Sequence, residues 1–224
     1  MIDPLNKSNP RWPIVIGIVL IAFALSIAGI SSQSVWYDEG LTVYYAQDSF
    51  GEILENVSQT DHPPLHPLLL HVWMMLGGKS ELTVRLFSTW CSIFALALLY
   101  QLGKKISIQI GTISSLLYAL SPLVIWYAQE TRGYTLALAL SIGTANAMLA
   151  LLPSARPLPT WKHYTLYVVL GAASLYSHFY TGFALLGLNL AYIVLSVRSI
   201  IYTRHGKRAL GYWLSAQVAI LALF

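Results

Sequence analysis

Acidic, basic and histidine side chains gather in three short polar segments of this chain. The segments and their residues of interest are VWYDEG with Asp38 and Glu39, TDHPPL with Asp61 and His62, and YAQETRGY with Glu130 and Arg132. A positioned carboxylate can take a proton from a hydroxyl nucleophile, and an arginine can bind a phosphate through two parallel hydrogen bonds. Each segment borders a long apolar run, where a charged side chain is costly unless it has a function. We therefore expect the three segments to form one polar site at the surface of a membrane.

The elements that must position this site are membrane helices. Apolar residues make up 56% of the 224 residues and charged residues only 10%, whereas about a quarter of the residues in a soluble domain are charged. The apolar runs are continuous rather than alternating, which predicts helices rather than a barrel. The net charge of +4 comes from basic residues near the ends of these runs, so it indicates topology rather than nucleic-acid binding. With Cys91 as the single cysteine, an intramolecular disulfide is excluded.

Seven apolar runs are candidates for membrane spans. They are Pro13–Ile30, Leu82–Gly103, Ile106–Tyr127, Tyr134–Leu152, Tyr164–Ser177, Gly182–Val197 and a last run from Ala209 to Phe224. The first has 18 residues, more than the apolar core of about 7–15 residues in a cleavable signal peptide, which favours a retained helix. The last has 16 residues, short of the ~20 that span a bilayer. Residues 209–224 are therefore interpreted as an incomplete span.

The stretch Pro64–Gly78 is also apolar, but its 15 residues suit an interfacial or re-entrant helix better than a span. If it does not cross, ten of the thirteen basic residues fall on one side of the membrane and eight of the nine acids on the other. Short loops rich in basic residues mark the cytoplasmic side. The expected topology is that of an inner (plasma) membrane protein, with residues 1–12 in the cytoplasm and all three polar segments on the outer face.

The first outer loop, residues 31–81, is long enough to contain helices of its own. Phe50, Ile53, Leu54 and Val57 follow the i, i+3, i+4, i+7 spacing of an amphipathic helix, which would lie flat on the bilayer. The sequence indicates no internal repeat and no separate soluble domain. We expect residues 1–224 to form a single all-α integral membrane module. It would be a polytopic bundle of about six or seven transmembrane helices, with interfacial helices in the first outer loop.

The carboxylates also have a structural interpretation. Asp38 could cap a helix, with Glu39 favourable to the dipole of its first turn. Asp61 could cap a helix that starts at the prolines following it. For Asp38 the structural and functional interpretations are compatible, because a carboxylate that caps a helix is also well oriented for chemistry.

The arginines have local partners as well. Glu130 and Arg132 could form an ion pair with each other, and Arg85 could pair with Glu81 one helical turn away. Exposed pairs of this kind contribute little to stability. An arginine at the outer face of a membrane is also a natural anchor for a phosphate.

Three histidines raise the question of a metal site. His62 and His66 could share a helix face, but His71 is poorly phased with them. Apart from Asp61, no further ligand is forced nearby, so we predict no metal. No glycine-rich loop for nucleotide phosphates is present either, and no cofactor is expected.

Beyond these residues, the longer stretches DHPPLHPLLLHVWMMLGGKSELTVRLFS and YAQETRGYTLALAL carry a family resemblance. Together with VWYDEG after a first span, they resemble the GT-C superfamily of membrane glycosyltransferases. The similarity is closest to the bacterial branch related to protein O-mannosyltransferases and to the aminoarabinose transferase of lipid A. It extends from Trp12 to about Tyr212, which resembles the shared N-terminal module of that family. The more variable C-terminal helices of the family have no counterpart in this sequence.

This resemblance implies a transferase that takes a sugar from a polyprenyl-phosphate carrier at the outer membrane face. Asp38 then corresponds to the catalytic aspartate of the first outer loop, and Glu39 to its acidic neighbour. Asp61 and His62 occupy the place where some relatives carry an acid followed by a lysine. If His62 binds the carrier phosphate, its charge would depend on pH, because histidine titrates near ~6.5.

The remaining site residues follow from the same resemblance. Glu130 and Arg132 fall in the second outer loop, where relatives keep another polar site. Polyprenyl phosphate gains negative charge as it leaves, so cations must face it. Arg132, Arg85 and His62 are the candidates for that role.

Two functions of other classes remain open. A transporter or channel would need charges within the spans, and these spans hold almost none. A non-catalytic transmembrane subunit derived from such a module could act as a scaffold in a larger membrane complex. The expected partners are the polyprenyl-phosphate sugar, membrane lipids and membrane proteins, without nucleic acid.

Overall fold

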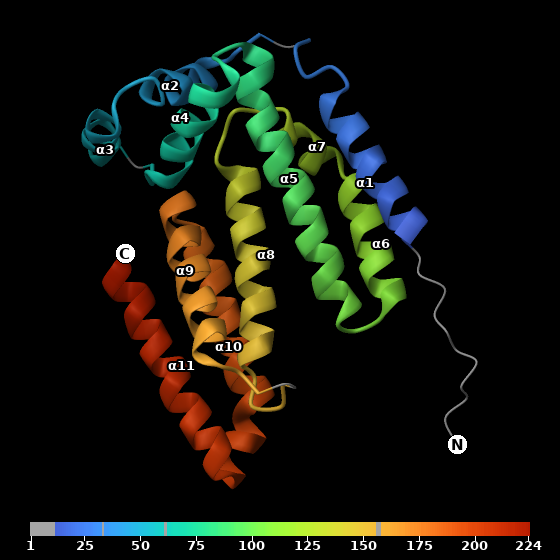
Figure 1. Cartoon of the computed structure of the whole chain (residues 1–224), viewed down its shortest axis with the longest axis vertical. Coiled ribbons are helices and arrows are strands. Elements are labelled where there is room, and N and C mark those ends of the chain that lie inside the picture. The colour runs from blue at the N-terminus through green and yellow to red at the C-terminus, as the bar shows by residue number, and fades with distance from the viewer. Residues whose placement is uncertain (1–11, 33, 61, 156–157) are drawn as a thin grey trace.

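The computed structural model describes residues 12–32, 34–60, 62–155 and 158–224, and in these residues it contains helices and no strand (Figure 1). The predicted all-α fold is confirmed. The helices are α1 (Trp12–Ile27), α2 (Tyr37–Tyr45), α3 (Phe50–Ser58), α4 (Leu65–Gly77), α5 (Glu81–Lys104), α6 (Ile108–Ala119), α7 (Pro122–Ala128), α8 (Tyr134–Leu151), α9 (Trp161–Ser177), α10 (Thr181–Tyr202) and α11 (Arg204–Leu223).

The long helices run side by side along the molecule, and the short helices α2, α3 and α4 gather at one end of it (Figure 1). We call this end the α2–α4 end. The starts of α5 and α8 and the turn between α9 and α10 lie at the same end. The connections α5–α6, α8–α9 and α10–α11 lie at the opposite end. The acidic residues that the structure describes therefore lie at the α2–α4 end, together with Lys79, Arg85 and Arg132, while the other described basic residues lie toward the opposite end.

Three helices are long and apolar enough to cross a membrane within the described part of the chain, namely α5, α8 and α10. A fourth span results if α6 and α7 are counted together, although they are bent by 64°. This break contradicts the expectation of one continuous run from Ile106 to Tyr127. Its cause is local, because Pro122 lacks the N–H that would continue the helix and favours the first position of a new one. The larger number of spans stays a prediction.

The loop between α1 and α5 contains the helices that the sequence predicts. In α3, Ile53 and Val57 are buried, while Phe50 and Leu54 from the same face are 51% and 49% exposed. The 13 residues of α4 make a helix of about 20 Å, shorter than the ~30 Å hydrocarbon core of a bilayer. In Figure 1, α4 stays at the α2–α4 end and does not run along the bundle. This placement agrees with the interpretation of Pro64–Gly78 as a segment that does not cross.

The expectation that Asp38 caps α2 was wrong. The helix begins at Tyr37, and Trp36 occupies the N-cap position with extended backbone angles. Asp38 and Glu39 are instead the second and third helical residues, where the helix dipole still favours negative charge. The capping role expected of Asp61 lies outside the described residues, and α4 begins at Leu65 after Pro64.

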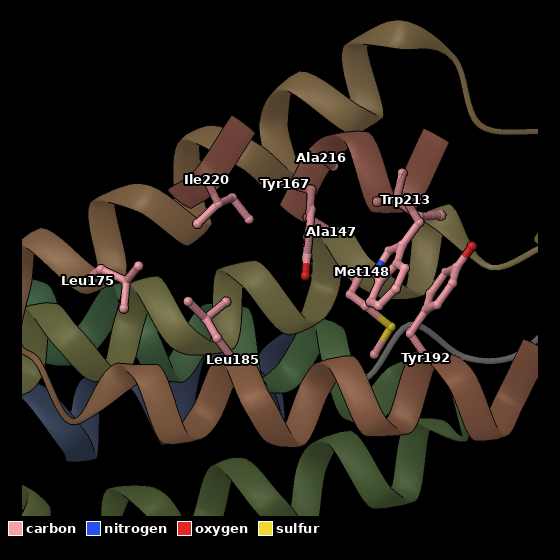
Figure 2. Packing of buried hydrophobic residues seen from close by; sticks show 10 residues of the cluster. Ala147, Met148, Tyr167, Leu175, Leu185, Tyr192, Trp213, Ala216 and Ile220 are labelled. Carbon is pink, nitrogen blue, oxygen red and sulfur yellow. The ribbon is translucent and has the colours of Figure 1, made fainter. Parts of the chain in front are cut away.

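The largest apolar core packs α8 against α9, α10 and α11, as Figure 2 shows. Tyr192 and Trp213 stack with ring centroids 4.7 Å apart and planes inclined by 5°. Fully buried Tyr167 donates to Asn189 Oδ1 at 3.2 Å and accepts a hydrogen bond from Gln217 Nε2 at 3.1 Å. These bonds satisfy the phenolic hydroxyl of Tyr167, which would be costly to bury without hydrogen-bond partners.

Helices α5 and α6 approach most closely at two glycines. A Cβ atom added to Gly103 would lie 2.7 Å from the Cα atom of Gly111 and 2.9 Å from its nitrogen. Both atoms belong to the backbone, so the helices themselves would have to separate. The close hairpin between α5 and α6 therefore requires glycine at this crossing.

We predict that Gly103→Ala lowers the thermal unfolding midpoint of the detergent-solubilised protein by several degrees, because overpacking costs about 1–3 kcal/mol. Gly187→Ala is the matched control, since nothing lies within 4 Å of the added Cβ atom in the middle of α10. That change should leave the midpoint unchanged or raise it, because alanine is favoured over glycine in a helix by up to about 1 kcal/mol. Equal effects of the two substitutions would contradict the steric explanation.

Candidate active site

A buried ion pair joins α2 to α5 at the α2–α4 end. Arg85 donates from Nε to Glu39 Oε1 at 3.0 Å and from Nη2 to Glu39 Oε2 at 2.8 Å. The side chains are only 3% and 1% exposed. Two parallel hydrogen bonds between a guanidinium and a carboxylate form the strongest common type of charged contact. The two residues are 46 positions apart in the sequence, so this contact fixes the first outer loop onto the long helix α5.

Further contacts extend the ion pair to other segments. The backbone N–H of Thr131 donates to Glu39 Oε1 at 2.8 Å, which connects the loop between α7 and α8. Arg85 Nη1 donates to the carbonyl oxygen of Ile30 at 2.6 Å and also to the carboxylate of Glu81. The predicted pair of Arg85 with Glu81 is therefore present, but it is one part of a larger network.

Additional hydrogen bonds hold the loop between α7 and α8 in place. Thr89 on α5 donates to the carbonyl oxygen of Ala128 at 2.9 Å, and Gln129 donates to the carbonyl oxygen of Ala28 at 2.9 Å. The loop is thus attached both to α5 and to the end of α1. Glu130 and Arg132 project from a backbone that is fixed on two sides.

The environment of Glu39 favours its charged form. Burial alone would raise the pKa of Glu39. The hydrogen bonds and the charge of Arg85 oppose this effect, as do backbone hydrogen bonds from Thr131 and Trp36. Together they hold the pKa of Glu39 below its ordinary value. A carboxylate whose oxygens are occupied in this way is a weak proton acceptor. The geometry favours an organising role for Glu39.

Asp38, the neighbouring acid, is more accessible. Its Oδ2 atom lies 3.6 Å from Arg132 Nη2, and its side chain is 38% exposed. Arg132 is 13% exposed and also donates to the backbone oxygen of Asp38 at 3.4 Å. Its guanidinium carbon lies 5.7 Å from the ring centroid of Tyr134. Arg132 therefore pairs with Asp38 across the loops, rather than forming the local pair with Glu130 that spacing suggested.

A cavity of about 450 Å³ lies beside the ion pair. It is lined by Gly29, Ile30, Ser34, Trp36, Glu39, Arg85, Trp126, Tyr127, Gln129, Glu130 and Tyr134. Burial raises the pKa of Glu130; a hydrogen bond with Trp126 opposes this rise, and the charge of Glu39 adds to it. The cavity thus combines a carboxyl group that is easily protonated with aromatic walls, which suits a polar ring with apolar faces.

A second, smaller cavity of about 60 Å³ adjoins the first, and Tyr134 lines both. The second cavity contains three histidines, His62, His66 and His178, together with Arg132. Burial and the charges of His62 and Arg132 lower the pKa of His178. Burial, aided by the charge of Arg132, lowers the pKa of His66 to about 3. The imidazoles of His66 and His178 thus offer nitrogen donors and acceptors beside the guanidinium of Arg132.

Most of the site residues predicted from sequence lie together. Glu39, Arg85 and Glu130 line the larger cavity, and Arg132 and His62 line the smaller one. Asp38 lines neither and contacts the site through Arg132. Asp61 lies outside the described residues. The roles of all these residues stay predictions.

Sequence reasoning left out several side chains at the site. Tyr134 and Trp126 are not among the predicted site residues, yet both line the larger cavity. His178 was not predicted either, and its ring lies 5.5 Å from that of Tyr134, measured between centroids. The turn between α9 and α10 brings it there, and no local sequence pattern shows this. Within the described part of the chain, no three His, Cys, Asp or Glu side chains lie close enough to hold a metal ion.

We predict that Arg85→Met destabilises the protein more than the double change Glu39→Leu/Arg85→Met. The single change leaves the charge of Glu39 buried without a partner, which costs about 3–5 kcal/mol, whereas removal of both charges is often nearly neutral. Thermal or denaturant unfolding in mild detergent measures the difference. A double variant that is less stable than Arg85→Met would contradict this account.

The pKa of Glu39 predicts a second effect, on the dependence of stability on pH. The pKa of Glu39 in the folded protein lies below the ordinary value of 4.5. The contribution of Glu39 to folding stability is therefore fully present above pH 4.5 and is lost as the pH falls through the folded pKa. Wild-type protein should therefore lose stability below about pH 4.5. Glu39→Gln should lose less over the same range, as measured by unfolding midpoints at a series of pH values. Identical pH profiles would contradict the assignment.

Comparison with known proteins identifies the family of this chain. A family model described as dolichyl-phosphate-mannose-protein mannosyltransferase matches residues 61–223. The matched region contains Arg85, Glu130 and Arg132, while Asp38 and Glu39 precede it. A search of curated proteins and a search of solved structures found no match. The match covers most of the chain and confirms the resemblance to membrane glycosyltransferases of the GT-C type. The chain belongs to the dolichyl-phosphate-mannose-protein mannosyltransferase family.

Proposed function

We propose that this protein transfers a sugar from a polyprenyl-phosphate donor to an acceptor hydroxyl at the outer face of the inner membrane, with its N-terminus in the cytoplasm. The observation that carries the proposal is the pair of adjoining cavities, where carboxylates and Arg132 meet at one end of an apolar bundle. A donor with a lipid tail and a phosphate-linked sugar needs such a junction. Family membership supports a lipid-linked sugar as the donor.

Arg132 is the cation best placed to bind the donor phosphate. It lines the smaller cavity together with His62 and His178, and its ion pair with Asp38 is long, at 3.6 Å. Arg85 was an equal candidate from sequence, but its guanidinium already contacts Glu39, Glu81 and the carbonyl oxygen of Ile30. We assign Arg85 the task of holding Glu39 and the loop after α7.

In the proposed reaction, Asp38 accepts the proton of the acceptor hydroxyl as its oxygen bonds to the anomeric carbon. The bond between that carbon and the phosphate oxygen breaks, and polyprenyl phosphate leaves with both bonding electrons. Arg132 faces the negative charge that develops; preorganised contacts of this kind contribute about 10²–10³-fold in rate. A single displacement inverts the configuration at the anomeric carbon.

The two other carboxyl groups have supporting roles in this proposal. Glu39 is saturated by donors, so it orients the first turn of α2 and thereby Asp38. Glu130 lines the larger cavity and has a raised pKa, so it is suited to hydrogen bonds with sugar hydroxyls. Tyr134, between the two cavities, provides an aromatic face for the sugar ring.

We predict that Asp38→Asn lowers the rate of sugar transfer by about 10²–10⁴-fold, because the amide cannot accept the proton. The assay measures transfer from radiolabelled polyprenyl-phosphate mannose, the sugar named in the family description, in proteoliposomes. Glu55→Gln is the matched control, since it removes the charge of an exposed acid on α3. Both variants should keep the wild-type unfolding midpoint.

Full activity of Asp38→Asn would remove Asp38 from the mechanism. If the wild-type protein neither binds nor uses any polyprenyl-phosphate sugar in a panel of donors, the proposed function itself is wrong. A partial loss in Asp38→Asn that equals the loss in Glu55→Gln would point to surface charge and not to a base.

A further inference from the structure

An open cavity of about 780 Å³ lies between α9 and α11, far along the bundle from the site described above. Both helices begin at the end opposite the α2–α4 end, and they lie next to each other (Figure 1). The cavity is lined by Pro159, Thr160, Trp161, Tyr164, Thr165, Val168, His205, Arg208, Ala209, Tyr212, Ser215, Ala216 and Ala219. We call it the α9–α11 groove. Its volume lies within the range of about 300–1,000 Å³ that is usual for ligand sites.

The two ends of the α9–α11 groove differ in chemistry. Thr160, His205 and Arg208 lie near the first residues of α9 and α11, so this end is polar and basic. Val168 and Ala219 lie further along the two helices, where the lining is apolar. The small side chains of α11 leave the groove open, and the apolar core of Figure 2 lies beneath it, since Ala216 belongs to both.

Among the residues that the structure describes, no carboxylate forms an ion pair with the cations at this end. No Asp or Glu follows Glu130 in the sequence. Of the ion pairs found among the described residues, none includes a basic residue from α9, α10 or α11. The acidic members of those pairs lie at the α2–α4 end. Arg208 thus forms no ion pair within the part of the chain that the structure describes, which favours an anionic ligand at this end.

Aromatic side chains mark the level at which a headgroup would lie. Tyr164 and Tyr212 contact each other across the groove with ring centroids 5.7 Å apart. Trp161 is exposed at the start of α9, and Lys162 lies over its ring at 5.9 Å from the centroid. Exposed tryptophan and tyrosine rings beside basic residues are typical of the boundary between headgroups and hydrocarbon. The apolar end of the groove is then directed toward the hydrocarbon.

We propose that the α9–α11 groove binds an anionic phospholipid, with the phosphate headgroup at Arg208 and His205 and an acyl chain along Val168 and Ala219. Charge complementarity carries the choice of occupant, because a basic pocket between membrane helices recognises anionic headgroups. A second protein copy or an apolar helix would leave the cations unpaired, which is costly at a buried interface. The site is distinct from the proposed donor site and does not depend on it.

The test measures phospholipid bound to the full chain in mild detergent by native mass spectrometry, with phosphatidylglycerol and phosphatidylcholine added at equal concentrations. Wild-type protein should retain phosphatidylglycerol in preference to phosphatidylcholine. Arg208→Gln should weaken phosphatidylglycerol binding about fivefold, the usual effect of one cation near an anionic headgroup. Arg198→Gln on α10 removes the same charge outside the groove lining and should have a smaller effect.

A second variant tests the acyl chain. Ala219→Phe fills the apolar end of the groove while the cations stay in place, so it should also weaken phosphatidylglycerol binding. Arg208→Lys keeps the charge and should bind as the wild type does, which separates loss of charge from loss of fold. Equal effects of Arg208→Gln and Arg198→Gln, equal retention of phosphatidylcholine, or normal binding by Ala219→Phe would each overturn the proposal. Self-association lost in Arg208→Gln, with lipid binding intact, would show that another copy fills the groove.

Discussion

The paired charges of Glu39 and Arg85 organise the α2–α4 end of this protein. Through that contact α2 is held against α5, and the same Glu39 carboxylate accepts the Thr131 N–H of the loop after α7. A buried ion pair is weak evidence for stability, because removing two charges from water costs as much as their attraction returns. Its value is specificity: one carboxylate position satisfies donors from two distant segments. The carboxylate and cation proposed for chemistry, Asp38 and Arg132, are then placed by their chain neighbours.

Charge is distributed along the bundle in a way that suits two different tasks. All carboxylates of the candidate site occur at or before Glu130, and the helices that follow it contain only basic charges. The α2–α4 end can therefore hold a reaction that needs both signs of charge. The opposite end, where the charged side chains of α9, α10 and α11 are all basic, is suited to anionic headgroups. The positive-inside rule uses the same separation of charge to predict which end of the bundle faces the cytoplasm.

Local patterns predicted the elements well, since each depends on neighbouring residues. The spacing of Ile53 and Val57 predicted α3, and the length of Pro64–Gly78 predicted a helix that stays at one end. Contacts between distant residues could not be predicted in this way. The sequence spacing predicted only Glu81 as a partner of Arg85, because nothing in the local sequence identifies Glu39 as the second partner. Pro122 is a local signal for the break between α6 and α7, but the continuous apolar run around it led to the prediction of one unbroken helix.

Tyr134 lines both cavities of the candidate site and stands at the start of α8. Its ring lies between Tyr127, at 4.6 Å, and His178, at 5.5 Å, measured between centroids. Because one ring lines both chambers, a different side chain at position 134 would alter the walls of both at once.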